Sequence, residues 1–310
     1  MDTVGVLAHR GGLLVDRPEL TVGVVRAVSR SDGLEVELIA RVPVDRLDSW
    51  GGPSAARHLL PAYDEGLDLR LGWLDAGGRA RWEYPTTTAT ATHYRWPRKR
   101  FRSLHVLPPL FDEVSLVLAW PEIGFPETVV ALPLPGRAEV DRDDAPLWTP
   151  GGGVPVVDEW ERLPVEDLLP EHIPDEVPVE TGTVVAGPVV LHGSAEATVT
   201  LARVTAVGPL LSVAVLTVAR GAAAEAVNVA AFAPHPPDGA HWDGLAIAVV
   251  HGSTARRLWL SGGTLGGGSG DFTAATDFVL PRPDGPLDLL VSWPVAGLSE
   301  VLVRVELDVP

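Results

Sequence analysis

Two short stretches of the sequence gather side chains that could do chemistry, and the first lies near residue 240. HPPDGAHWD, residues 235–243, holds two imidazoles and two carboxylates, which are ligand types that divalent metals accept. Proline, glycine and aspartate also make ordinary surface turns, so a turn is the favoured interpretation and a metal site the weaker alternative. The candidate ligands are His235, Asp238, His241 and Asp243.

The second stretch, HYRWPRKRFR over residues 93–102, contains five basic residues and no acidic one. Aromatic side chains lie among the arginines, and a guanidinium beside an aromatic face suits carboxylates, phosphates or RNA bases. The favoured structural interpretation is a solvated hairpin that pairs with the acidic strap of the same molecule or of a neighbour, and the functional alternative is a surface for a partner protein. The candidate partner-binding residues are Tyr94, Arg95, Trp96, Arg98, Lys99, Arg100 and Arg102.

Motifs for nucleotide binding and covalent catalysis are missing from the sequence. GGTLGGGSG, residues 262–270, lacks the Lys-Ser/Thr pair of a P-loop. The chain has no cysteine, which excludes disulfides, thiolate metal sites and a cysteine nucleophile. A Ser-His-Asp triad converges in space and not in sequence, but no nucleophile elbow is visible. We therefore predict a protein that is not an enzyme and that needs no cofactor.

The net charge of −17 disfavours nucleic acid and anionic membranes as partners, because binding to either needs a surplus of Lys and Arg. Residues 141–180 concentrate this charge, with 12 Asp and Glu against 2 Arg. No run of about 18 apolar residues and no basic-then-apolar leader occurs. The sequence therefore predicts a cytoplasmic protein with no membrane contact.

An internal repeat predicts the architecture that positions these stretches. LAWPEIGFPE (118–127) and VSWPVAGLSE (291–300) share Trp, Pro, Gly and Glu at an offset of 173, and residues 19–38 align with 196–215 at an offset of 177. Equivalent features in the same order predict duplicated domains rather than a solenoid. Trp120 and Trp293 are then core anchors beside a tight turn. The predicted organisation is repeat 1 over 1–140, an acidic strap over 141–180 and repeat 2 over 181–310.

Alternating apolar and polar residues indicate strands, as in EVLVRVEL (300–307), and 29 Pro with 32 Gly indicate many turns between them. We predict an all-β fold of two tandem antiparallel β-sandwich domains of the immunoglobulin-like kind. Helices are expected only at 45–60 and 222–232, which occupy equivalent positions in the two repeats. The proline-rich strap is too apolar for a disordered linker, so we expect it to pack on a sandwich, or else to dock on another chain.

These observations favour a non-catalytic protein-binding scaffold, adaptor or structural subunit of a larger assembly. Its partner would be another protein or a second copy of the chain. The alternative is a glycan or small-ligand module in which exposed aromatic side chains act as stacking platforms. A metal-dependent enzyme centred on His235 and His241 is the third hypothesis. The candidate stacking residues are Trp73, Trp82, Tyr84 and Trp96.

Overall fold

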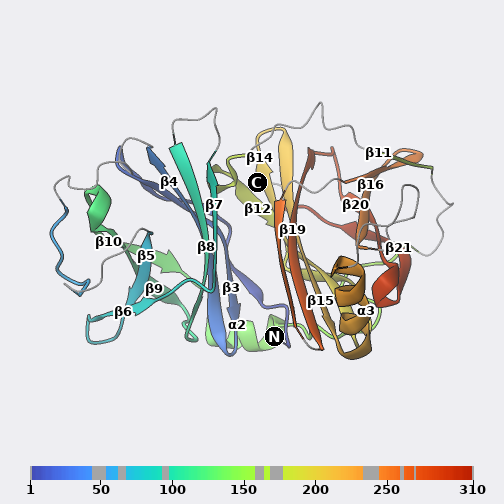
Figure 1. The fold of residues 1–310 in the computed structure, drawn as a ribbon, viewed down its shortest axis with the longest axis horizontal. Helices are drawn as coiled ribbons and strands as arrows, with labels where there is room; N and C mark the ends of the chain where they lie inside the picture. The colour runs from blue at the N-terminus through green and yellow to red at the C-terminus, as the bar shows by residue number, and fades with distance from the viewer. Residues whose placement is uncertain are drawn as a thin grey trace. The chain divides into compact units, whose positions relative to one another are not determined.

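The computed structural model shows an all-β protein with four sheets, which confirms the predicted fold class (Figure 1). Most strand pairs among the described residues are antiparallel, and one short pair is parallel. No helix among the described residues is long and apolar enough to cross a membrane. The internal duplication stays a prediction. The structure describes residues 2–43, 54–61, 68–92, 98–157, 164–167, 177–232, 244–258, 262–268 and 270–308.

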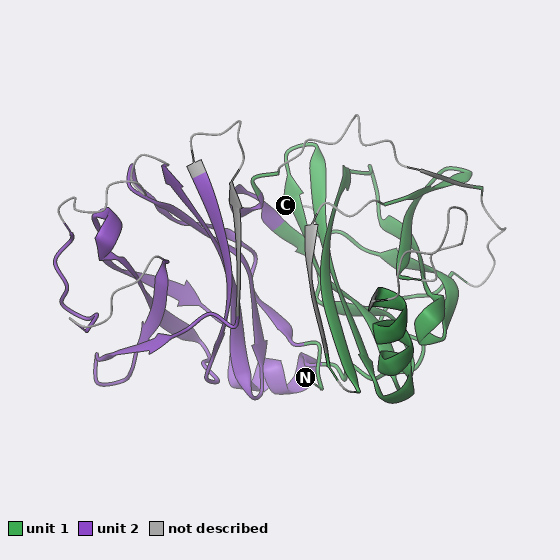
Figure 2. Ribbon diagram, viewed as in Figure 1, with its two compact units in different colours: residues 1–4, 145–178, 184–310 green, residues 5–144, 179–183 purple. Residues whose placement is uncertain are grey.

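The chain divides into two compact units (Figure 2). Unit 2 contains residues 5–144 and 179–183, and unit 1 contains residues 1–4, 145–178 and 184–310. Each unit therefore includes a short segment that is separated from the rest of that unit along the chain.

Unit 2 contains two sheets. The larger has the order β1-β3-β4-β8-β7, with β2 also paired to β3, and the smaller has the order β10-β9-β5-β6. Its strands are β1 (Val6–His9), β2 (Gly12–Asp16), β3 (Thr21–Arg30), β4 (Gly33–Pro43), β5 (Arg70–Leu74), β6 (Ala80–Glu83), β7 (Thr87–Thr92), β8 (Arg98–Leu107), β9 (Glu113–Trp120) and β10 (Phe125–Pro133), and its helical turns are η1 (Pro121–Ile123), α2 (Arg137–Asp143) and η3 (Val179–Thr181).

Unit 1 has the corresponding pair of sheets. The larger has the order β12-β14-β15-β19-β18, with β13 also paired to β14, and the smaller has the order β11-β17-β16-β20-β21. Its elements are β11 (Val165–Asp167), β12 (Thr183–Ala186), β13 (Val189–Gly193), β14 (Ala197–Val207), β15 (Leu210–Arg220), α3 (Gly221–Phe232), β16 (Ala246–His251), β17 (Thr254–Arg257), β18 (Gly262–Gly268), β19 (Asp271–Pro281), β20 (Leu287–Trp293), η4 (Pro294–Ala296) and β21 (Leu298–Val305).

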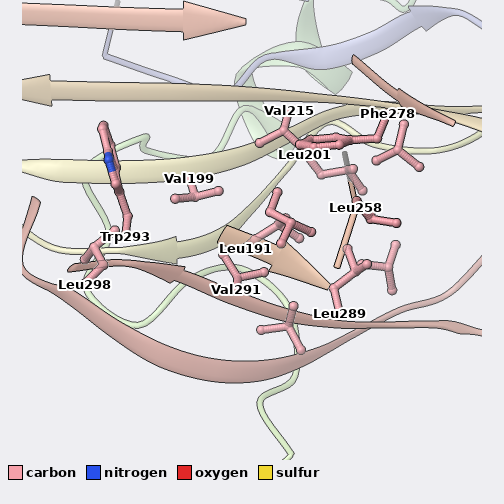
Figure 3. Close-up of a cluster of buried hydrophobic side chains, with 14 of the residues drawn as sticks. Leu191, Val199, Leu201, Val215, Leu258, Phe278, Leu289, Val291, Trp293 and Leu298 are labelled. Atoms are coloured by element: carbon pink, nitrogen blue, oxygen red, sulfur yellow. The ribbon is translucent and has the colours of Figure 1, made fainter. Parts of the chain in front are cut away.

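Each unit buries an apolar core between its two sheets, because alternate residues of a strand point to one face. The core of unit 2 joins Leu38 on β4 to Leu118 on β9. The core of unit 1 joins Val199 and Val215 of the larger sheet to Val291 of the smaller (Figure 3). This arrangement is that of a sandwich in both units.

The repeated Trp-Pro turn has the same backbone in both units. Trp120 has φ −149° and ψ 67°, and Trp293 has φ −144° and ψ 72°. One 3₁₀ turn follows, and it ends at a left-handed glycine, Gly124 or Gly297, whose N–H donates to the carbonyl of the turn's proline at 2.9 Å. Only glycine adopts this positive φ without strain. Both tryptophans are buried, as predicted for core anchors.

One of the two predicted helices forms. Helix α3 confirms the prediction for 222–232, and Ala224 and Val227 form its buried face. Residues 54–61 contain no helix, so the prediction for 45–60 is wrong in its described part. The physical reason is a competing acceptor, because the N–H groups of residues 58–60 donate to the Glu127 carboxylate at 2.6–2.9 Å. Residues 45–53 lie outside the described residues.

The strap, residues 141–180, supplies strand-like pieces at both edges of the smaller sheet of unit 1. Residues 155–157 lie along β21, where Val156 forms an isolated antiparallel bridge with Val303. Strand β11 pairs in parallel with β17 at the opposite edge. The strap therefore pairs with the outer side of β17 and with part of the outer side of β21, which leaves these stretches unavailable for pairing with other molecules.

Candidate partner-binding surface

The described part of the basic stretch forms the start of β8, the strand next to the outermost strand of the larger sheet of unit 2. Strand β8 begins at Arg98, and Lys99, Arg100 and Arg102 follow within it. Tyr94, Arg95 and Trp96 lie outside the described residues, and the side chain of Arg98 is likewise not described. The structure therefore locates three of the seven predicted side chains.

Strand alternation divides these three side chains between the two faces of the sheet. Lys99 lies on the core side, where its ammonium is 5.1 Å from the ring centroid of Phe101. Phe101 in turn meets Trp120 edge-on, with 5.1 Å between ring centroids. Arg100 and Arg102 lie on the opposite face. The basic residues are therefore not one continuous patch.

Arg102 belongs to a charge network on the face of β3, β4 and β8 that points away from the core. Glu37 on β4 pairs with Arg102 and, at 3.0 Å, with Arg26 on β3. Glu35 pairs with Arg26 and, at 3.3 Å, with Arg30. Both carboxylates are buried. Among the described ion pairs, three arginines share two buried glutamates.

Burial and charge act in opposite directions on the pKa of Arg26. Desolvation lowers this pKa, but the nearby Glu35 and Glu37 carboxylates outweigh it and the pKa is raised. Arg26 therefore stays charged at every pH that the fold survives. Such buried pairs fix geometry more than they add stability.

Glu180, at the end of the acidic strap, packs against the same sheet. The Glu180 carboxylate pairs with Arg41 on β4, and its side chain lies against Gly23 on β3, where a Cβ would collide with that of Glu180. Glu180 is buried. The expected pairing between the acidic strap and basic residues thus involves Arg41, which is outside the predicted stretch.

Strand β7 is the outermost strand of this sheet. Ala91 lies opposite Arg100, and Ala89 lies opposite Arg102. Within the described residues its strand partner is β8 alone. An edge strand exposes unpaired N–H and C=O groups that a further strand can use. The arginines of β8 therefore lie next to a potential pairing edge.

The predicted metal ligands fall in one loop of the sequence. His235, Asp238, His241 and Asp243 lie outside the described residues. The part of the chain that the structure describes contains no group of three or more His, Asp or Glu side chains placed to hold a metal ion.

Two of the aromatic residues of the glycan hypothesis lie on opposite faces of one sheet. Trp73 packs against the core of unit 2. Trp82 lies opposite Gly72, hence on the other face from Trp73, and its indole N–H donates to the Leu59 carbonyl at 3.3 Å. Tyr84 is 72% exposed. Trp96 lies outside the described residues.

A hydroxyl–imidazole pair on β8 was not predicted. His105 Nε2 lies 3.1 Å from Ser103 Oγ. Burial lowers the pKa of His105 to about 4, although a hydrogen bond to the backbone of Glu83 opposes the shift. His105 is 0% exposed, so a substrate has no access to this imidazole. The pair is part of the packing of unit 2.

The charge network itself was also missed by sequence reasoning. Its signal was present in RAVSRSDGLEVE, residues 26–37, where arginine and glutamate recur at even spacing on either side of the turn at Ser31 and Asp32. Opposite charges placed this way in a hairpin meet across the strands. The pattern predicts cross-strand pairs once the turn is located.

Comparisons with known proteins place the chain in no family. No family model and no curated protein matches it. The crystal structure of the conserved domain protein from Bacillus anthracis aligns over 93% of this chain and 77% of its own, with 8% sequence identity and a TM-score of 0.19. A likeness this low carries no argument about fold or function.

Proposed function

We propose that the protein is a non-catalytic protein-binding scaffold, adaptor or structural subunit of a larger protein assembly. The observation that carries the proposal is that β8, which contains the described part of the basic stretch, pairs with β7, the outermost strand of the sheet. A partner segment can add a strand along β7 through main-chain hydrogen bonds. The neighbouring basic residues then select a partner with acidic side chains and speed its approach.

Arg102 is a poor residue for testing this proposal. Its guanidinium pairs with the buried Glu37, so a change to glutamate would bring two carboxylates together and destabilise unit 2. Arg95 and Arg98 lie before or at the start of β8 and are better targets. Thermal unfolding of the Arg95→Glu, Arg98→Glu double variant, measured beside binding, separates a loss of binding from a loss of folding.

The test is a pull-down from native lysate, analysed by mass spectrometry, followed by reconstitution with the purified partner. The matched control is the Arg79→Glu, Arg137→Glu double variant, which changes the charge equally at two exposed arginines. We expect wild type and control to retain one defined partner that the double variant at 95 and 98 loses. Retention of that partner by both variants would rule out this surface.

A further inference from the structure

The outermost strands of the two smaller sheets, β10 and β21, occupy equivalent positions. Each follows the Trp-Pro turn, and each has a register shift just after its first residue. Val129 on β10 lies opposite Val117, and Leu302 on β21 lies opposite Leu290. Both pairs keep the offset of 173 found in the sequence, so the two edges can be compared residue by residue.

The edge of β21 is occupied by the strap. The N–H of Val157 donates to the Leu302 carbonyl at 2.9 Å, and the N–H of Arg304 donates to the Pro155 carbonyl at 3.2 Å. Val157 also packs on an apolar cluster outside the sheet that includes Leu302 and Leu290. Leu302 is consequently only 6% exposed. A Pro-Val-Val segment in extended conformation thus completes this edge.

Among the described residues, no segment pairs with the corresponding edge of β10. Val129, the counterpart of Leu302, is 49% exposed. Because the registers match, the carbonyl of Val129 and the N–H of Ala131 point away from β9, as those of Leu302 and Arg304 point away from β20. Within the described residues, β10 has β9 as its strand partner and no other. The Val129 side chain, its carbonyl and the N–H of Ala131 are therefore available together to a binding partner.

The length of this edge limits what can bind there. Pro133 has no N–H to offer, which ends the series of outward donors after Ala131. Glu127 places a carboxylate at the other end, where it holds the N–H groups of residues 58–60. A proline and a charge at the ends of an edge strand block a long strand, such as β10 of a second copy, but leave room for about three residues.

We propose that β10 binds an extended proline-valine-valine-type segment of a partner protein by antiparallel strand addition at Val129–Ala131. The bound segment reproduces what residues 155–157 do at β21. This site is separate from the basic hairpin β7–β8. The two proposals therefore stand or fall independently, since variants of β10 leave Arg95 and Arg98 unchanged.

The probe is a synthetic peptide with the sequence of residues 151–158, GGGVPVVD, added to the full-length protein. Hydrogen exchange resolved to short fragments measures amide protection. We expect saturating peptide to slow exchange at Val129–Ala131 at least about fivefold. A peptide with Ser-Gly-Ser in place of Pro-Val-Val should have no effect. No protection at β10, or protection confined to β21 through exchange with the strap, would overturn the proposal.

Three variants test whether the peptide binds β10 by strand addition. Ala131→Pro removes the outward N–H and should abolish protection, whereas Ala131→Ser keeps it and should retain binding. Val129→Lys, a change at an exposed side chain, should also abolish binding and covers the case in which the proline variant fails to fold. Equal protection in the lysine variant would contradict the proposal. So would a concentration-dependent dimer that disappears in it, because the occupant would then be a second copy.

Discussion

Arg26 in unit 2 and Arg203 in unit 1 occupy the same place in their sheets and have different partners. Each follows a register shift, between Val24 and Arg26 on β3 and between Leu201 and Arg203 on β14. Arg26 pairs with two buried carboxylates on the neighbouring strand. Arg203 bonds hydroxyl groups of Thr205 and Ser212, and pairs with Asp277 on β19 at 3.2 Å.

An arginine stands at the same backbone position in both units, but the residues around it are charged in unit 2 and mostly neutral in unit 1. Ser212 and Ala214 stand in unit 1 where Glu35 and Glu37 stand in unit 2, at the offset of 177. Unit 2 therefore holds several interdependent charges on this face. In unit 1, the ion pair between Arg203 and Asp277 is supported by neutral hydroxyls. The same substitution at Arg26 and at Arg203 should therefore lower the free energy of unfolding by different amounts.

The largest expected effect comes from replacing these arginines by methionine. Arg26→Met removes a partner from both buried glutamates, and breaking such a network should cost roughly 3 kcal/mol. Arg203→Met fills the space with an apolar side chain and leaves one partly exposed aspartate, so we expect about 1 kcal/mol. Urea unfolding followed by hydrogen exchange assigns each loss to a unit. A larger loss of stability for Arg203→Met than for Arg26→Met would contradict the interpretation that the charges around Arg26 depend on one another more strongly.

The next effect depends on pH and compares His105 with its counterpart Phe278. His105 lies opposite Val36, and Phe278 lies opposite Val213. The pKa of His105 is about 4 in the folded chain and about 6.5 when unfolded. Below pH 6.5 the unfolded chain therefore binds a proton that the folded chain does not. Stability should fall by about 3 kcal/mol between pH 6.5 and pH 4 and then level off.

His105→Phe should remove this part of the pH dependence. The free energy of unfolding is measured at pH 7 and at pH 4 for wild type and variant. The loss between the two pH values should be smaller in the variant. His9 and His192 also have a lowered pKa because of burial, and both are unchanged in the variant. An identical loss on acidification in the two proteins would show that His105 is not responsible.

The smallest effect separates the two glutamates of the repeated turn. Glu127 accepts three backbone N–H groups of residues 58–60, whereas Glu300 is exposed. Glu127→Ala should cost about 1–2 kcal/mol, since three donors lose their acceptor. Glu300→Ala should stay within about 0.5 kcal/mol. Thermal unfolding of both variants checks this, and equal shifts would mean that residues 54–61 do not depend on Glu127.

The features predicted correctly are those that a few neighbouring residues determine. Alternation in residues 300–307 predicts a strand, and the Trp-Pro turn needs its left-handed glycine wherever it occurs. The alanine-rich stretch at 222–232 forms a helix because it has good local propensity and a buried face. Residues 54–60 fail as a helix because their donors are taken by Glu127, which lies far away in the sequence.

The candidate site was predicted less completely because it depends on register. Arg26 reaches Glu35 and Glu37 only because the shift after Val24 sets which residues of β3 face away from the core. Sequence spacing around Arg102 indicates positive charge but not its partner on β4. The contact between Glu180 and Gly23 joins residues far apart in the chain, and no local pattern indicates it.

The exchange of short segments between the units restricts how this chain can be recombined. The N–H of Val4 donates to Ala145, and the N–H of Leu147 donates to Asp2, so residues 1–4 belong to unit 1, while residues 179–183 belong to unit 2. Cleavage at residue 144 would deprive each fragment of one of these segments. A gene fusion that transferred either half as a single continuous cassette would deliver an incomplete sandwich. Neither unit is therefore encoded by a single continuous stretch of the gene.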